Sequence, residues 1–142
     1  MQANLLFTKK PEALTGYRIA QIDGAKSKTL KGFYKEIAAV LDFPDYFGFN
    51  LDSLDEFLND LSWIKEKNIV LFIADSQYFI DNNSDQDKLN SLLALLDEAA
   101  YNWKMTENND QLIPQKKLKI AFSPNKRLKQ LLDRLGIKYE IL

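Results

Sequence analysis

The sequence predicts a single α/β domain over residues 1–142, with a small, mainly parallel sheet and helices packed on it. Three observations support this prediction. Apolar runs of strand length alternate with segments in which apolar residues recur at helical spacing. The run "NIVLFIA" at 68–74 is continuous and rich in β-branched residues, as in a strand covered on both faces. The chain of 142 residues is 46% hydrophobic, an ordinary composition for one globular domain.

The first half of the chain shows five predicted elements: a strand at 4–7, a strand at 17–23, a turn at 24–29, a helix at 30–43 and a helix at 51–63. Thr29 and Asn50 are the expected N-caps of the two helices, because their side chains can accept a bond from an early helical amide. Pro44 is expected to stop the first helix, because the residue before a proline disfavours the helical conformation.

The second half continues the alternation with a strand at 68–75, a short helical turn at 76–81, a long helix at 87–103, a loop at 104–117, a strand at 118–124, a helix at 126–136 and a closing strand at 137–142. The last helix is expected to open at Pro124 or Asn125 and to end at Gly136. The closing strand is a candidate exposed sheet edge, where another chain could pair.

The residue types that are missing exclude several chemistries. With no cysteine, the chain has no disulfide and no thiol chemistry. With no histidine, it lacks the commonest general base and transition-metal ligand, and a Ser–His–Asp triad is excluded. The segment "GAKSKT" at 24–29 lacks the first glycine of a phosphate-binding loop, so we interpret it as a turn. We expect no enzyme activity, no cofactor and no metal.

Neither membrane insertion nor secretion is predicted. The longest apolar runs are far too short to span a bilayer, and the first ten residues lack the basic and apolar regions of a signal peptide. Together with the absence of cysteine, these features lead us to expect a cytoplasmic protein without a membrane partner.

The charges are unevenly distributed, although the formal net charge is only −1. No Lys or Arg lies between Lys35 and Lys65, a stretch with seven acids: Glu36, Asp42, Asp45, Asp52, Asp55, Glu56 and Asp60. From Lys104 onward, nine bases face four acids. This basic part, with "KRLKQLLDR" on a helix, leaves direct nucleic-acid binding as an alternative. A solvated helix face is the simpler interpretation, because no aromatic residues interleave these bases.

The predicted helix at 51–63 has an acidic outer face, opposite its apolar stripe, that comprises Asp52, Asp55, Glu56 and Asn59. Acids in a first turn suit the helix dipole, which accounts for Asp52 but not for Glu56 or Asp60. Pairs of these side chains could hold Mg²⁺ or Ca²⁺, or serve as an acid/base pair in glycoside hydrolysis. A solvated row on a surface helix suits neither role, because both need an enclosed site.

Aromatic residues gather next to these acids. Phe43 and Phe57 are expected to be buried, whereas Tyr46 and Phe49 are expected to be at least partly exposed. Exposed aromatic rings beside a row of acids suit an interface with a basic protein partner.

The stretch "FPDYFGFNLDSLDEFLNDL" at 43–61 resembles the signature of the barstar family of ribonuclease inhibitors, in which P-x-Y-[YF]-G-x-N leads into L-D-A-L-x-D-x-L. The resemblance extends over a core of about 17–123, with additional segments at 1–16 and 124–142. It implies a barstar-like three-layer fold with a three-stranded parallel sheet and no catalysis. The segment 124–142 is expected to add a helix and an edge strand, and 1–16 a further strand.

The resemblance also implies a mode of action and roles for single residues. The loop and second helix would plug the active site of a secreted ribonuclease, with carboxylates in the place of RNA phosphates. Contact positions of the family fall on Tyr46, Asp52 and Glu56, while its turn glycine and helix cap fall on Gly48 and Asn50.

Three further positions compare with the family as follows. Trp63 matches a tryptophan at the end of the helix, whereas Asp55 replaces a contact tryptophan. The family's contact acid on the long helix aligns with Asn90, with Asp87 about one turn earlier. The predicted partner-binding surface comprises Tyr46, Phe47, Phe49, Asp52, Asp55, Glu56, Asn59, Asp60, Asp87 and Asn90.

The expected function is therefore intracellular inhibition of a basic, barnase-like ribonuclease, without direct binding of nucleic acid. The departures at Asp55 and Asn90 leave an alternative within the same fold. In that alternative the chain is an immunity or regulatory protein for a different basic partner, such as a toxin that is not a ribonuclease.

Overall fold

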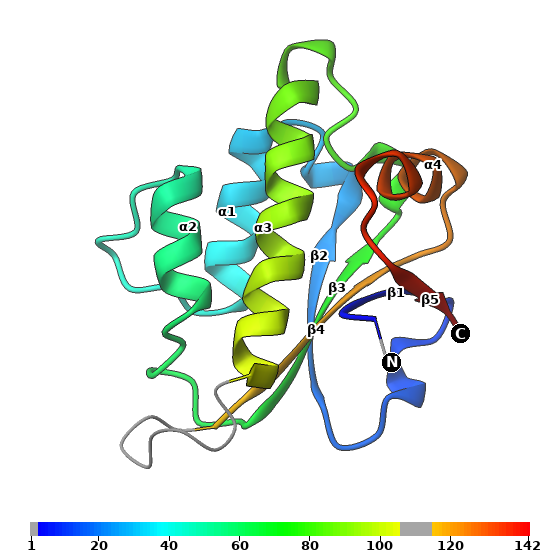
Figure 1. Ribbon diagram of the computed structural model, residues 1–142. Helices are drawn as coiled ribbons and strands as arrows, with labels where there is room; N and C mark the ends of the chain where they lie inside the picture. The colour runs from blue at the N-terminus through cyan, green and yellow to red at the C-terminus, as the bar shows by residue number, and fades with distance from the viewer. Residues whose placement is uncertain (1–2, 106–114) are drawn as a thin grey trace.

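The computed structural model describes residues 3–105 and 115–142, which form a five-stranded parallel sheet with helices packed on it (Figure 1). The strands are β1 (Leu5–Phe7), β2 (Arg18–Asp23), β3 (Asn68–Ala74), β4 (Lys117–Phe122) and β5 (Tyr139–Ile141). Their order in the sheet is β2-β3-β4-β1-β5, and every neighbouring pair is parallel. The predicted α/β class with a small parallel sheet is confirmed.

The helices of the described ranges are α1 (Leu30–Val40), α2 (Leu51–Leu58), α3 (Gln86–Met105) and α4 (Lys126–Leu135). Short 3-10 turns lie at Pro11–Ala13, Gly24–Lys26, Ser76–Tyr78 and Asn83–Asp85. None of the described helices is long and apolar enough to cross a membrane. The predicted loop at 104–117 lies mostly outside the described residues, because α3 continues to Met105 and 106–114 are not described.

Alternate strand residues face the two sides of the sheet. Leu71 of β3 packs in the main core, to which α1, α2, α3 and α4 all contribute, whereas Val70 and Phe72 belong to a smaller cluster on the opposite side. Leu14 and Tyr17, in the connection from β1 to β2, pack against this smaller cluster. The connection must pass over β3 and β4, which separate β1 from β2. Helices, sheet and connection therefore form three layers.

The predicted capping residues lie at the ends of the helices. Thr29, Asn50 and Asn125 each accept a hydrogen bond from the amide three residues later, at 3.0, 2.8 and 2.9 Å. Gly136 ends α4 in the left-handed conformation, with φ of 70°. Asn125 rather than Pro124 is therefore the residue that opens α4.

Two predicted helices are shorter than expected. The first ends at Val40, before Pro44, because the chain leaves the helix at Asp42, whose φ is 52°. The second ends at Leu58 instead of Trp63. The indole N–H of Trp63 donates to the backbone oxygen of Leu41 at 2.8 Å, so the chain after α2 turns back towards the end of α1. Trp63 and Leu41 are 22 residues apart in the sequence, so helical periodicity could not predict this contact.

Candidate protein-binding surface

The loop before α2 is fastened to the first turn of the helix. The backbone amide of Gly48 donates to the hydroxyl of Ser53 at 2.8 Å, and the side-chain amide of Asn50 donates to the Gly48 carbonyl at 3.0 Å. The Asn50 side-chain oxygen also accepts from the Ser53 amide. A Cβ at position 48 would lie 3.0 Å from the Asn50 side-chain nitrogen, which is tighter than an ordinary contact. Glycine therefore allows the loop to pack closely on the helix N-terminus.

Aromatic rings pack between this loop and the core. Phe47 is only 5% exposed, and its ring centroid lies 5.3 Å from that of Phe57, which is also buried. Phe43 packs on both rings but is half-buried instead of fully buried. Phe47 was assigned to the partner-binding surface from the sequence, but its side chain belongs to the core and can act on a partner only by supporting the loop.

Two other rings face solvent. Tyr46 is 72% exposed, with its ring 5.3 Å from that of Phe57, and Phe49 is 49% exposed, with its ring 4.8 Å from that of Phe47. Each exposed ring thus rests on a buried one. Such a ring loses little conformational freedom on binding, as is typical of an interface anchor.

The acids of α2 are exposed, and none of them forms an ion pair within the described residues. Both ion pairs found there use Arg18, which contacts Asp42 at 3.3 Å and Glu66 at 3.2 Å. We call the following exposed side chains the acidic surface: Tyr46, Phe49, Asp52, Asp55, Glu56, Asn59 and Asp60. Its carboxylates lie open to solvent and so lack the apolar enclosure that an acid/base pair would need. Among the described residues, no group of three or more Asp or Glu could hold a metal ion.

A chain of side-chain hydrogen bonds connects α3 to the acidic surface. The side-chain amide of Asn102 donates to the side-chain oxygen of Asn59 at 3.1 Å. Asn59 in turn donates to the Asp55 carboxylate at 3.0 Å and to the Asp55 backbone oxygen at 2.7 Å. The carboxylate of Asp55 thereby accepts a hydrogen bond from a neutral donor on the same surface. The sequence contained no signal for Asn102, which lies inside a long helical pattern.

Asp87 and Asn90 lie apart from the other predicted contact residues. They belong to the first two turns of α3, where Asp87 is exposed and Asn90 is half-buried. At 1.5 Å per residue, Asn90 is about 18 Å along α3 from Asn102, whereas Asp52 is only about 10 Å along α2 from Asn59. Because α2 and α3 lie side by side in the same direction (Figure 1), the start of α3 extends past the start of α2. A partner must therefore be large to reach both.

Comparison with known proteins agrees with this arrangement. A family model described as barstar (barnase inhibitor) matches residues 17–115. A comparison with curated proteins finds no match. The matched range contains β2, β3, the loop, α1, α2 and α3, whereas β1, β4, β5 and α4 lie outside it. The match covers more than half of the chain, and the chain therefore belongs to the barstar family.

Proposed function

We propose that this protein inhibits a basic ribonuclease by covering the active site of the enzyme with the acidic surface. The observation that supports the proposal is the row of exposed carboxylates on α2 that have no basic partner within the described residues. A ribonuclease presents Lys and Arg to RNA phosphates. Carboxylates can accept charge-assisted, bidentate hydrogen bonds from the same side chains. Charge of opposite sign also speeds the encounter of inhibitor and enzyme.

Within this proposal the carboxylates have different tasks. Glu56 is on the central contact position that the family resemblance implies, and its longer side chain reaches further than an aspartate. Asp55 places a second carboxylate next to it, which accepts a hydrogen bond from Asn59. We therefore expect a target with an additional Lys or Arg opposite Asp55, where other family members present a tryptophan ring.

A different basic partner is the second candidate, because Asp55 and Asn90 depart from the family pattern. Nucleic-acid binding by α4 is less favoured by the structure. Leu128, Leu131 and Leu132 of α4 are buried in the core, and the guanidinium of Arg127 donates to the backbone oxygen of Phe79. This bond directs the Arg127 cation into the protein, and its burial lowers the pKa of the guanidinium. We place the inhibitor in the cytoplasm of the cell that produces the enzyme.

The direct test is a titration of the protein into an assay of a barnase-type ribonuclease, at low and at high salt. We expect stoichiometric inhibition that weakens as salt rises, because salt screens exposed charges. Enzyme that stays fully active at every salt concentration would contradict this target class. The next step would then be a pull-down of basic partners, with Glu56→Ala as the control bait.

A further inference from the structure

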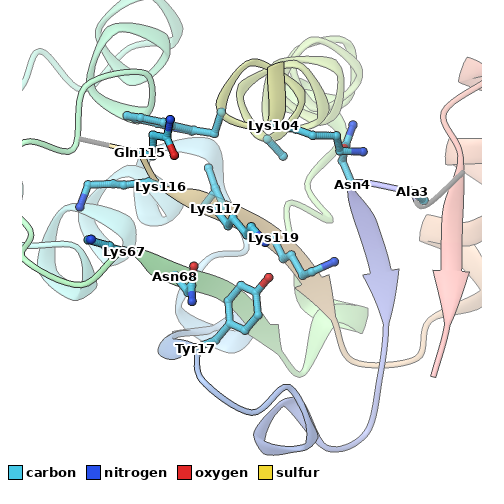
Figure 2. Close-up of a pocket in the computed structure, with 13 residues that line it drawn as sticks. Ala3, Asn4, Tyr17, Lys67, Asn68, Lys104, Gln115, Lys116, Lys117 and Lys119 are labelled. Carbon is cyan, nitrogen blue, oxygen red and sulfur yellow. The ribbon is translucent and has the colours of Figure 1, made fainter. Parts of the chain in front are cut away.

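A pocket of about 590 Å³ lies beside the C-terminal end of α3 (Figure 2). Its walls come from the last turns of α3, the first residues of β3 and β4, Tyr17 before β2, and the segment before β1. This volume is in the range of small-molecule sites. The pocket does not include the loop before α2 or any residue of the acidic surface.

The charge of the pocket is one-sided. Among the residues that the structure describes, its lining has no acid and five lysines: Lys67, Lys104, Lys116, Lys117 and Lys119. Two of these have structural roles. The ammonium of Lys116 donates to the backbone oxygens of Ile64 at 2.6 Å and Glu66 at 2.8 Å. Lys104 is in the last turn of α3, where a cation suits the helix dipole.

The other three lysines have no such role. Lys117 and Lys119 alternate along β4 and so point to the same face of the sheet, while Lys67 immediately precedes β3. Neither ion pair found in 3–105 and 115–142 involves them. Lys117 and Lys119, two residues apart on one face of β4, repel each other, and a bound anion would relieve that repulsion.

Neutral groups add hydrogen-bonding capacity and an apolar wall. Figure 2 shows the Tyr17 hydroxyl directed towards β4, from which Lys117 and Lys119 come. Burial raises the pKa of Tyr17, so the hydroxyl keeps its proton and can donate at neutral pH. Trp103 is buried in the wall, with its indole N–H donating to the Leu58 oxygen at 2.7 Å.

The acids Asp97 and Glu66 do not line the pocket but act on residues that do, Asp97 on Asn4 and Glu66 on Lys116. The side-chain amide of Asn4 donates to the Asp97 carboxylate at 3.1 Å, and Asn4 lines the pocket whereas Asp97 does not. The amide thus separates this negative charge from the lysines.

We propose that this pocket, which we call the lysine pocket, binds a small phosphorylated ligand of nucleotide size with at least two negative charges. Lys117 and Lys119 would bind the phosphates, and the hydroxyl of Tyr17, which packs on the same side of the sheet, would donate to a phosphate oxygen. Lysine is a common phosphate ligand in proteins. The proposal does not depend on the proposed function, because the two sites share no residue.

Calorimetric titration at low salt tests the proposal, with ATP, pyrophosphate and adenosine as probes. We expect saturable one-to-one binding of ATP, weaker binding of pyrophosphate, and no binding of adenosine. The double variant Lys117→Gln/Lys119→Gln should weaken ATP binding by about tenfold or more, because two charge-assisted contacts are lost. Tyr17→Phe should weaken it less.

The matched control is Lys9→Gln/Lys10→Gln, which removes the same charge from exposed positions outside the pocket. It should bind ATP like the unmodified protein, and both double variants should melt at the same temperature without ligand. Absence of saturable binding for both ATP and pyrophosphate would overturn the proposal, as would an equal loss of affinity in the two double variants. Ribonuclease inhibition should be unchanged in Lys117→Gln/Lys119→Gln, so failure of one proposal is distinguishable from failure of the other.

Discussion

The acidic surface and the lysine pocket have opposite charge and are built in different ways. The carboxylates of the acidic surface follow one another on α2 and just after it, so they are neighbours in the sequence. The lysines of the pocket come from separate segments at 67, 104 and 116–119. The net charge of −1 conceals this separation. An average charge therefore says little about the partners of a protein whose charges are segregated.

The two regions share a support. The carbonyl of Leu58, at the end of α2, accepts the indole N–H of Trp103, which lines the lysine pocket. The segment that follows α2 is held by Lys116 through the carbonyls of Ile64 and Glu66. Changes at this junction should affect both regions, whereas changes on either side of it should affect only one.

Leu58→Ala has the widest expected effect. Leu58 is fully buried behind the acidic surface, and a cavity there should lower the free energy of unfolding by about 2–5 kcal/mol. Denaturant unfolding measures the loss. Leu135→Ala is the matched control, because Leu135 is 37% exposed and its removal should cost less than about 1 kcal/mol. Equal losses in the two variants would show that the buried Leu58 side chain contributes no more to stability than the exposed Leu135.

Glu56→Ala should separate the two regions most clearly. We expect it to weaken the complex with a ribonuclease by about 2–5 kcal/mol, the usual cost of removing one partner of a buried charge pair. The barnase–barstar complex, from the same family, is one of the complexes on which this range is based. Its melting temperature and its ATP binding should be unchanged, since Glu56 is exposed and outside the pocket. Inhibition constants at two salt concentrations measure the effect. Glu12→Ala removes an exposed acid in the β1–β2 connection and should have no effect. If Glu56→Ala inhibits like the unmodified protein, the central role of Glu56 is wrong.

Asn102→Ala tests whether the hydrogen bonds from α3 orient the acidic surface. Loss of the bond to Asn59 should weaken inhibition by about 0.5–1.5 kcal/mol. A double-mutant cycle with Asp55→Ala identifies the route, because Asn102→Ala should have no further effect once the Asp55 carboxylate is absent. Additive losses in the cycle would assign Asn102 a different role.

Asp85→Asn should have the smallest effect. It tests whether protonation of Asp85 contributes to the loss of stability at acidic pH. Hydrogen bonds from the Leu30 amide and the Asn82 side chain, both at 2.9 Å, hold the pKa of Asp85 below its usual range. The carboxylate therefore contributes stability at pH values above its unfolded pKa of about 3.9, and this contribution is lost as the pH falls through the lower, folded pKa. Unfolding measured from neutral pH downward should show a shallower acid loss in Asp85→Asn. An identical pH profile would contradict this assignment.

Much of the fold was predictable because its signals are local. The N-caps Thr29, Asn50 and Asn125 and the terminating Gly136 act on amides and carbonyls within a few residues. The exposed face of α2 was equally predictable, because helical periodicity alone separates Leu54 from its acidic neighbours.

The two candidate regions were predictable to different degrees. Acids without neighbouring bases in a short stretch indicated the acidic surface directly. Phe47 could not be separated from Tyr46 and Phe49 by sequence, because burial of an aromatic loop residue depends on which ring has room beneath the loop. Asn102 and the lysine pocket gave no signal, since no spacing rule connects residues on different elements.

By itself, the sequence determined the class of fold, the order of helices and strands, their caps and the acidic face of α2. These features depend on interactions over a few residues, which spacing and residue type record. Only the tertiary structure decided that β1 lies between β4 and β5, that α1 and α2 end early, and that five lysines line one pocket. Such features arise from contacts between residues far apart in the chain, such as Trp63 with Leu41 and Lys116 with Ile64. Their geometry is set by packing of the whole core.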